Sequence, residues 1–375
     1  MLHADIVILG GGPVGLLLAC LLARRGLPVR VLEAEASIPQ ESRAIGIHPP
    51  GLDALAAAGV ADEVITQGVR VRQGVVHLRG RQRAVRFDKA HGTYGFVLSV
   101  PQRLTTMALE RRLQELAPDA LRRERRVTAL LRRGPRHELT VESPDGVHTM
   151  QADLVLACDG AHSLVAKAAG LAHEPMAAGP AYVMADVPDT TSLGDDAHLF
   201  LGDAPVVESF PLPGDRRRWV VGIGRERAAD DRAAQAALVE RLVRERTGHV
   251  APAAEAVMVS AFTAEQHMAP CLVRDGVVLA GDAAHAISPI GGQGMSLGWL
   301  DTLALAAAVP DAAALSRYDR RRRAAARTAS ARASLFMWLG TPLRHTALRD
   351  LTLALLLAPG VRTHTAKVIA MRGLG

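Results

Sequence analysis

The hydrophobic pattern of the first 33 residues predicts a strand, a glycine turn, a helix and a second strand. Residues 5–9 (DIVIL) form a short apolar run of the kind that is buried in a parallel sheet. A helix is expected over 13–25, because its last turn is basic and Gly26 follows, both common at helix C-termini. Residues 28–32 form the second strand, which Glu33 ends. This order is that of a β–α–β unit, which joins parallel strands.

Strand and helix patterns then alternate as far as about residue 165. Residues 69–87 alternate apolar and polar positions around Gly80, which predicts a hairpin. A helix is expected over 101–116, with proline in its first turn, where it is tolerated. Other short helices are expected at 49–58 and 60–67, and other strands at 43–47, 97–100, 125–131, 137–141 and 154–158.

The pattern changes between about residues 170 and 263, where short strand-like pieces are split by proline and glycine turns. This predicts an antiparallel sheet layer, built partly with the earlier hairpin. The pieces are expected at 181–186, 198–201, 206–211 and 218–223, with one helix over 231–247. The chain then returns to a buried strand at 276–281 and ends in helices from about 295, over 311–339 and over 342–357.

Together these elements predict an α/β fold. It consists of a Rossmann-like domain, a second and mostly antiparallel β-sheet domain, and C-terminal helices. The composition agrees with a globular enzyme, since 49% of the 375 residues are hydrophobic and 22% are charged. The longest late apolar run, 351–358, is too short for a membrane span, and the N-terminal run lacks a basic region before it. We therefore expect a cytoplasmic protein without membrane contact.

The net charge of +6 does not indicate a nucleic-acid partner. Only three of the 44 basic residues are lysines, so arginine enrichment accounts for the charge as a bias of composition. The basic clusters at 122–126, 216–218 and 320–323 are not interleaved with several aromatic residues, which a base-stacking surface would need. Cys20, Cys158 and Cys271 are far apart in apolar surroundings, so we expect reduced packing residues, and no metal-ligand spacing is present.

The glycine turn of the first unit reads G-x-G-x-x-G and predicts a dinucleotide site. Gly10 allows the tight turn, Gly12 lets a pyrophosphate approach the backbone, and Gly15 lets helix and strand pack closely. The phosphates would lie on the unpaired N–H groups at the start of the helix, next to Pro13. Glu33 is placed to accept hydrogen bonds from a ribose diol, which favours FAD or NAD over NADP.

Two later loops carry candidate cofactor contacts. The strand at 154–158 ends on Asp159-Gly160, at the edge of the sheet where a ligand is expected. Taken alone, this pair fits a plain turn equally well. The strand at 276–281 ends on Gly281-Asp282 with His285 close behind, followed by a proline and a glycine-rich turn before a helix. Glycines at a helix start present backbone N–H groups to an anion or a polar ring.

These three motifs, in this order, resemble those of the class A flavin-dependent monooxygenases, the p-hydroxybenzoate hydroxylase-like group. The resemblance covers nearly the whole chain, and it implies that the first motif binds the ADP part of FAD. Asp159-Gly160 would serve FAD and the nicotinamide donor, Asp282 would bind the ribityl chain, and Pro289 would lie against the flavin ring. The helix that starts near Gly294 would point its positive end at the N1–C2=O edge, where reduced flavin is anionic.

The resemblance also extends to single positions outside these motifs. Arg43 matches an arginine beside the flavin, Gln102 a polar residue at the start of a cofactor-facing helix, and Val127 a backbone contact to adenine. The complete set of expected cofactor-binding residues is Gly10, Gly12, Pro13, Gly15, Glu33, Arg43, Gln102, Val127, Asp159, Gly160, Gly281, Asp282, Pro289, Gly291, Gly292, Gly294 and Met295.

The sequence departs from the family pattern at two places. Ser296 stands where the family usually has asparagine. Ala166-Lys167 replaces the family's usual arginine, and lysine lacks the fork geometry of a guanidinium. Arg43 and His285 are the only weak candidates for a catalytic role, and Asp301 is expected to make a structural hydrogen bond.

The resemblance implies an FAD-dependent monooxygenase. NAD(P)H, a transient donor without a domain of its own, would reduce the flavin, and a flavin C4a-hydroperoxide formed from O₂ would hydroxylate a small to medium aromatic substrate, phenolic or polyketide-like. The substrate pocket is expected near residues 199–210 and 219–223. Two alternatives stay open: an FAD-dependent reductase or epoxidase of a prenyl or polyketide substrate, and a non-catalytic flavin-binding protein. A tryptophan-type halogenase is excluded because its W-x-W-x-x-P signature is absent.

The same reasoning divides the chain into domains. The FAD-binding domain is expected to be discontinuous, over 1–68, 96–170 and 264–310. The substrate-binding domain is expected over 69–95 and 171–263, and the C-terminal helices over 311–375. The oligomeric state is expected to be a monomer or a homodimer.

Overall fold

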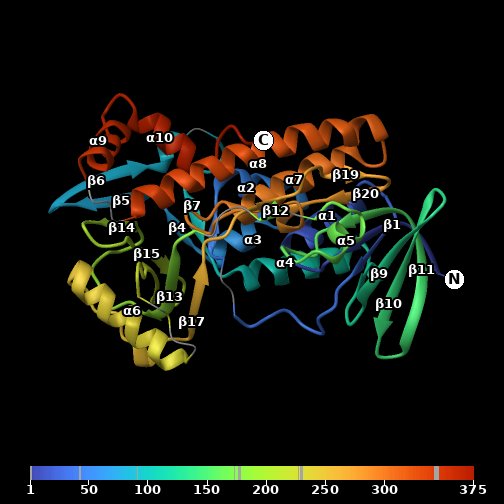
Figure 1. Cartoon of the computed structure of the whole chain (residues 1–375), viewed down its shortest axis with the longest axis horizontal. Helices are drawn as coiled ribbons and strands as arrows, with labels where there is room; N and C mark the ends of the chain where they lie inside the picture. The colour runs from blue at the N-terminus through green and yellow to red at the C-terminus, as the bar shows by residue number, and fades with distance from the viewer. Residues whose placement is uncertain are drawn as a thin grey trace.

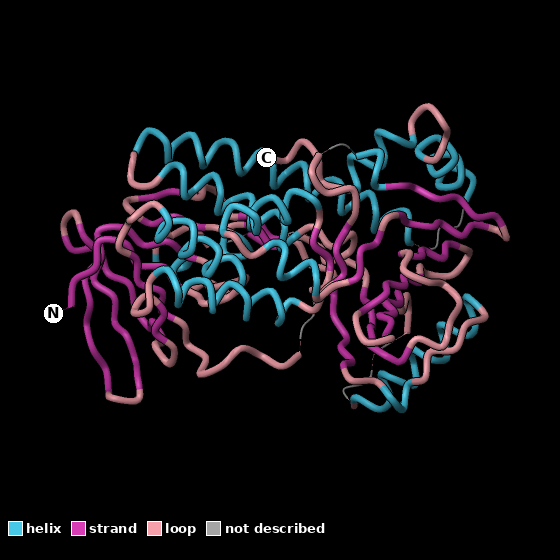
Figure 2. The backbone as a smooth tube through the Cα atoms, turned by 180° about the vertical axis from the view of Figure 1, so that it is seen from behind, coloured by secondary structure: helices cyan, strands magenta, loops and turns pink. Residues whose placement is uncertain are grey.

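The computed structural model describes residues 2–41, 44–90, 92–172, 174–175, 179–226, 228, 231–341 and 346–375. Figure 1 shows two lobes, one around the N-terminal strand and one beside α6 (Arg232–Thr247), with the long helix α8 (Ala312–Gly340) running across both. Figure 2 shows them from behind, with strands in both lobes, several helices between the lobes and further helices above and below the strands of the second lobe.

The first lobe is built on an eight-stranded sheet with the order β19-β20-β11-β1-β2-β8 and with β10 and β9 added beside β11. The pairs from β20 to β8 are parallel, as the buried apolar runs predict. Its strands are β1 (Leu2–Leu9), β2 (Val29–Leu32), β8 (Leu121–Arg122), β9 (Arg126–Arg133), β10 (Arg136–Ser143), β11 (Gly146–Ala157), β19 (Val273–Arg274) and β20 (Val277–Leu279).

Helix α1 (Pro13–Arg24) lies at the centre of this lobe, against α4 (Gln102–Leu116) and α7 (Gly294–Ala308). It is apolar nearly all round, which is typical of a helix enclosed by other elements. Its leucines pack with those of β1, β11 and β20 into one core. The other helices of the lobe are α2 (Pro49–Ala58), α3 (Ala61–Thr66) and α5 (Leu164–Ala168), with the 3₁₀ turn η3 (Gly281–Ala283).

The second lobe is a seven-stranded sheet with the order β17-β13-β16-β15-β14-β5-β6, antiparallel except for the β14–β5 pair. Helix α6 covers one face, where Val183, Trp219 and Val221 are buried. The other face is turned toward the C-terminal helices. The strands are β5 (Gln73–Leu78), β6 (Arg81–Arg86), β13 (Ala181–Pro188), β14 (Ala197–Leu201), β15 (Val207–Leu212), β16 (Arg216–Gly222) and β17 (Met258–Thr263).

Two small three-stranded sheets complete the β structure of the described chain. One contains β3 (Gly46–Ile47), β7 (Val97–Ser99) and β4 (Val69–Val71), and the other contains β12 (Glu174–Pro175), β18 (His267–Met268) and β21 (His285–Ala286). The remaining short elements are the 3₁₀ turns η1 (Phe87–Ala90) and η2 (Ala253–Glu255).

The C-terminal helices join the two lobes. The middle of α8 packs on α7 through its alanines, while Met337 and Leu339 near its end pack on the second sheet. Helices α9 (Thr346–Leu356) and α10 (Arg362–Ile369) then return over β5 and β6, at the upper left of Figure 1. Within the described residues, no helix combines the length and the apolarity that crossing a membrane requires.

The predicted α/β class is confirmed, and most elements lie where the sequence places them. Two expectations need correction. The strand expected at 154–158 begins at Gly146, directly after the turn at 144–145, because the whole segment pairs with β10 or β1. The expected hairpin at 69–87 is formed by β5 and β6 alone, since β4 pairs with β7 in a different sheet.

Candidate functional site

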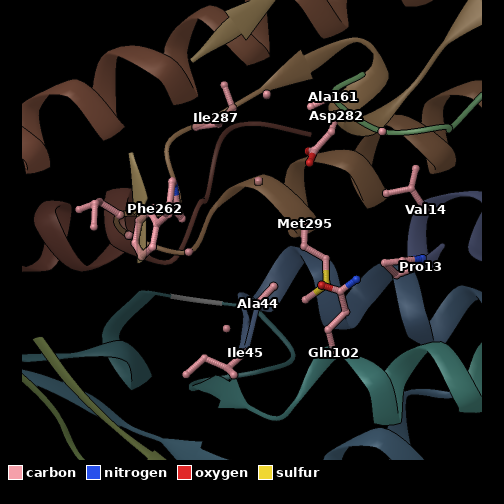
Figure 3. A pocket seen from close by; sticks show the side chains of 18 of the residues that line it. Pro13, Val14, Ala44, Ile45, Gln102, Ala161, Phe262, Asp282, Ile287 and Met295 are labelled. Atoms are coloured by element: carbon pink, nitrogen blue, oxygen red, sulfur yellow. The ribbon is translucent and has the colours of Figure 1, made fainter. Parts of the chain in front are cut away.

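A cavity of about 1530 Å³ runs from the glycine turn after β1 to the inner face of the seven-stranded sheet. Figure 3 shows its length: Pro13 and Val14 lie at one end, Phe262 at the other, and Gln102, Asp282 and Met295 between them. Its lining is mainly apolar at the sheet end, with Val76, Leu199 and Val220. The shape is that of a long cleft joined to a chamber.

The glycines of the first turn have three different geometries. Gly10 has a φ of +97°, and a Cβ there would lie 2.4 Å from the Cys158 carbonyl oxygen. A Cβ on Gly15 would lie 2.0 Å from the Gly10 carbonyl oxygen, so strand and helix require glycine at this contact. A Cβ on Gly12 would meet no atom within 4 Å, and Gly12 faces the cavity. These geometries agree with the reasons that the sequence suggested for each glycine.

Glu33 at the end of β2 closes over the same turn. The backbone N–H of Gly11 donates to Glu33 Oε2 at 2.6 Å, and that of Glu35 donates to Oε1 at 2.8 Å. Both carboxylate oxygens are therefore held in place at the wall of the cavity. A carboxylate oxygen has two lone pairs, so each retains room for a further hydrogen bond from a ligand.

Helices α1 and α7 both begin at the cavity without a side-chain cap. Gly12 precedes α1, with Pro13 in the first turn, and Gln293 precedes α7 after the positive-φ residues Gly291 and Gly292. The first N–H groups of both helices have no intrahelical partner. The cavity therefore receives two positive helix ends, which are suited to anionic or polar groups.

Asp159 and Gly160 follow β11 and line the same cavity. Burial raises the pKa of Asp159, although hydrogen bonds from Ser163 and from backbone N–H groups act in the opposite direction. Asp159 Oδ1 is buried and has no hydrogen-bond partner among the described residues. A buried carboxylate oxygen without a partner is costly, so this atom indicates a missing polar ligand.

His285 lies behind the cavity wall, as part of a buried ionic cluster. Its Nε2 is 2.6 Å from Asp301 Oδ2, and Asp301 Oδ1 accepts from Arg322 Nε at 2.7 Å. The backbone N–H of Gly281 donates to the same aspartate at 3.0 Å. Asp301 is fully buried, and neither it nor His285 lines the cavity. The structural hydrogen bond expected of Asp301 is present, and the position of His285 favours a structural role over a catalytic one.

Most of the sequence-derived site residues meet at this cavity. Gly15 and Gly281 do not line it: Gly15 contacts Gly10, and a Cβ on Gly281 would contact Val14. Arg43 lies outside the described residues. The residues that line the cavity are Gly10, Gly12, Pro13, Glu33, Gln102, Val127, Asp159, Gly160, Asp282, Pro289, Gly291, Gly292, Gly294 and Met295.

The two departures from the family pattern have different settings. Ser296 is fully buried, its hydroxyl accepts from the backbone N–H of His48 at 3.1 Å, and it does not line the cavity. A Cβ added at Gly51 would lie 2.7 Å from that hydroxyl, so glycine at this position of α2 allows the close contact with Ser296. Lys167 is exposed and lines the cavity.

Among the buried polar residues of the cavity wall that sequence reasoning missed are His48 and Glu208. Burial lowers the pKa of His48 to about 4, and its Nε2 lies 2.9 Å from the Gly291 carbonyl oxygen, so a neutral ring donates there. Glu208 lies on β15. The expected lining by residues 199–210 holds, but Trp219 faces α6 and only its neighbours Arg218 and Val220 reach the cavity.

These features fit FAD. The open space over Gly12 and the uncapped start of α1 suit a pyrophosphate, and Glu33 suits a ribose diol. The unpaired Asp159 Oδ1 and the uncapped start of α7 supply polar partners further along the cleft. No cluster of side chains that could hold a metal ion is found within the described ranges.

The family model described as "FAD binding domain" matches residues 3–333, so the chain belongs to this FAD-binding family. The resemblance to the class A flavin-dependent monooxygenases is confirmed by this match and by the relatives below. FAD is accordingly the cofactor of this fold.

Among similar sequences is 6-methylpretetramide 4-monooxygenase of Streptomyces rimosus, 33% identical over 318 residues. The match covers 80% of this chain and 55% of that relative. Para-nitrophenol 4-monooxygenase of Pseudomonas sp. (strain WBC-3) is 29% identical, over 81% of this chain and 77% of the relative. The chain therefore spans only about half the length of the first of these relatives.

Solved structures agree with the fold. Anhydrotetracycline hydroxylase from Streptomyces rimosus superposes with a TM-score of 0.80 at 26% identity, over 98% of this chain and 76% of that chain. p-Nitrophenol 4-monooxygenase from Pseudomonas putida DLL-E4 superposes with a TM-score of 0.87 at 24% identity, over 99% and 98%. The second likeness concerns the fold alone.

Proposed function

We propose that this chain is an FAD-dependent monooxygenase that uses NAD(P)H and O₂ to hydroxylate a phenolic or polyketide-like aromatic substrate. The observation that carries the proposal is the continuity of the cavity, which joins the glycine turn at one end to an apolar sheet face at the other. A flavin held by the glycine turn would reach toward that chamber. The relatives named for 6-methylpretetramide and para-nitrophenol support an aromatic substrate.

In this proposal the chain's own residues hold and orient the cofactor. Gly12 and the start of α1 bind the pyrophosphate, and Glu33 binds the ribose. Asp159 and Asp282 bind polar groups further along, and Pro289 lies against the ring. The start of α7 stabilises negative charge on the ring edge, since a helix N-terminus favours anions. FAD, when bound, would supply the redox chemistry that activates O₂ with electrons from NAD(P)H.

The other end of the cavity excludes water from the reaction. Its apolar lining comes from the second sheet and from the C-terminal helices, so an aromatic substrate would replace water there. The nicotinamide donor would visit without a second glycine fingerprint, which this sequence lacks.

The first test uses the purified protein. It should be yellow from bound flavin, or become so when FAD is added. Its oxidation of NAD(P)H should rise with a phenolic substrate, with O₂ consumed and a product heavier by one oxygen atom in mass spectrometry. A colourless protein that FAD cannot restore would contradict the proposal, and turnover without O₂ would favour the reductase alternative.

The second test concerns Asp282, which lines the middle of the cleft (Figure 3). Asp282→Ala should weaken FAD binding by roughly 10- to 100-fold, because one or two hydrogen bonds to the cofactor are lost. The measurement is flavin fluorescence during dilution. Asp203→Ala, at an exposed aspartate outside the cavity, is the matched control. Equal flavin retention by both variants would remove the role assigned to Asp282.

A further inference from the structure

Glu208 occupies the middle of the seven-stranded sheet, on the face that lines the chamber. On β15 it pairs in register with Val220 of β16 on one side and Leu199 of β14 on the other. Both neighbours line the cavity, as does Glu208 itself. The side chain is only 6% exposed. A carboxyl group is therefore buried at the floor of the proposed substrate chamber.

The surroundings of Glu208 are apolar. The row of sheet residues on either side of it consists of Met184, Val220, Leu199 and Val76, all of which line the cavity. The C-terminal helices add further apolar walls. These cavity-lining residues are Phe336, Leu339, Leu353, Leu356, Leu357 and Ile369.

No residue in the described ranges hydrogen-bonds to or pairs with the Glu208 carboxyl group, and burial alone raises its pKa to about 7. The Arg218 guanidinium on the neighbouring strand lines the cavity too, but it is held by Asp186 through two hydrogen bonds of 2.6 and 2.8 Å. A structural acid in such a place would normally be paired, because an unpaired buried carboxyl group is costly.

The other titratable groups on the elements packed around Glu208 are few. Tyr182 on β13 is buried, and burial raises the pKa of its hydroxyl group above the usual value, so it stays neutral. Arg349 of α9 is engaged with Asp350 and with the Gly202 carbonyl oxygen. His77 and His198 lie on the opposite face, against each other, and burial lowers the pKa of both. Glu208 is thus the group on this face of the described sheet that changes charge near neutral pH.

We propose that Glu208 receives the phenolic hydroxyl group of the substrate, accepting its hydrogen bond and then its proton. The inference rests on the proposed hydroxylase function and narrows its substrate class. Substrates would carry a free phenolic hydroxyl, while an aromatic carboxylate would place a second negative charge beside Glu208. A carboxylate with a pKa near neutral is suited to this transfer, since a general base works best near the operating pH.

The proton transfer balances as follows. The phenolic O–H bond breaks, its proton forms an O–H bond with Glu208, and the electron pair left behind is shared with the ortho and para carbons of the ring. One of these carbons bonds to one oxygen atom of the O₂ that the holoenzyme activates with two electrons from NAD(P)H; the O–O bond breaks, and the other oxygen atom leaves as water. That carbon then loses its hydrogen as a proton to solvent, the ring regains aromaticity, and Glu208 returns its proton to the phenolate oxygen.

The test compares phenols with their methyl ethers in FAD-loaded protein. The probes run from phenol itself to a bicyclic naphthol, each paired with its O-methyl ether, because these hydroxyl groups ionise well above neutral pH. The wild type should favour a phenol over its ether by at least about tenfold in kcat/KM. Glu208→Gln should lower kcat on phenols by roughly 10²- to 10⁴-fold, the range of general base catalysis. Glu208→Leu should bring the phenol-to-ether ratio of dissociation constants close to one.

The pH profile gives a second readout. Because the ionised carboxylate is the proton acceptor, wild-type kcat/KM should rise with pH through about 7, and Glu208→Gln should lose this rise. Glu245→Gln, at an exposed glutamate of α6, is the control and should behave as the wild type.

The outcomes separate the two proposals. If no phenol stimulates NAD(P)H oxidation in wild-type protein that holds FAD, the hydroxylase function fails. If wild-type protein hydroxylates phenols but Glu208→Gln keeps the full rate, the ratio and the pH profile, the role of Glu208 is overturned. If the Glu208 variants do not retain FAD, the test uses the wild-type protein alone. Equal kcat/KM for a phenol and its ether, together with no rise of kcat/KM near pH 7, would then overturn the role of Glu208.

Discussion

Substitutions at single glycines of the first turn should affect either FAD binding or protein stability, but not both. Gly12→Ala adds a Cβ into open space at a φ of −77°, so the FAD-free protein should keep its melting temperature. The same Cβ would lie where the pyrophosphate must approach, and FAD affinity should fall at least about tenfold. Gly15→Ala should instead destabilise the FAD-free protein by about 1–3 kcal/mol, because its Cβ overlaps the Gly10 carbonyl oxygen.

Thermal unfolding of both FAD-free variants and FAD titration of the folded ones measure these effects. The two variants control each other, since they make the same chemical change three positions apart. A stable FAD-free Gly15→Ala protein would show that close packing at Gly15 is not required for stability. Unchanged FAD affinity in Gly12→Ala would show that the pyrophosphate does not approach the backbone at Gly12.

The residue scale also shows what the sequence could not reveal. The spacing of the three glycines is enough to assign each a reason, because those reasons are local to one turn. Glu208 could not be found in this way. In the stretch at 206–212 the polar pair Glu208-Ser209 stands between apolar residues, and a charged residue in such a strand is expected to face solvent. The pattern identifies which residues share a face, but not that this face borders a buried chamber.

At the scale of elements, Asp301 connects α7 to its neighbours. It accepts hydrogen bonds from Gly281 at the start of η3, from His285 on β21 and from Arg322 on α8. Asp301→Asn should therefore destabilise the protein by about 3–5 kcal/mol, since a buried charge pair is broken and Arg322 remains buried. Denaturant unfolding measures this, with the exposed Asp195→Asn as control.

The same cluster has a pH dependence. Burial opposes protonation of His285, but the charge of Asp301 and the hydrogen bond to it together raise its pKa above the ordinary value. Its contribution to stability should be complete below about pH 6.5 and should be lost as pH rises through the raised pKa. Asp301→Asn should remove this component, and an unchanged stability–pH curve would argue against the pairing.

Elements were predictable where one strong signal marked them, as for α1 with Pro13 and Gly26 or α6 with its capping residue Asp231. They were less predictable where pairing decided their length. Strand β11 extends back to Gly146 because β10 accompanies it across a short turn, and β4 leaves the hairpin because β7 is available to it. Local periodicity does not report which strand another strand pairs with, whether the partner lies across a short turn or more than twenty residues along the chain.

At the scale of the whole molecule, the end of α8 sets the position of the second lobe. The Gly340 carbonyl oxygen accepts from the Val206 backbone N–H at 3.0 Å, and a Cβ on Gly340 would lie 2.8 Å from the Val206 side chain. Gly340→Val should push the helix off the sheet and change the chamber that both residues line. We expect substrate-stimulated NAD(P)H oxidation to fall by about 100-fold, as misplacement by about 1 Å can cause.

FAD affinity should be unchanged in this variant, because the glycine turn is far along the cavity from Gly340. Gly360→Ala, where a Cβ would meet no atom, is the matched control in the same C-terminal region. Normal turnover by Gly340→Val, measured with the phenols described above, would mean that the contact between α8 and Val206 does not shape the chamber.

The proposed division into discontinuous domains rests on the order of motifs. The cavity that crosses between the lobes could not be derived from that order. It depends on how far α8 reaches and on which sheet face α6 leaves uncovered. The first is set by packing of α8 on strands more than a hundred residues earlier in the chain, and the second by packing of α6 on the strands around it in the sequence.

The cleft and the chamber are one space with no partition between them in the described structure. Whatever fills the nucleotide end therefore fixes how much volume remains at the sheet end. A bound flavin would therefore have two roles. It would take part in the reaction, and it would form the wall of the pocket that limits the size of an aromatic substrate. Selective substrate binding would then require that FAD binds first, and the FAD-free protein would discriminate poorly between substrates.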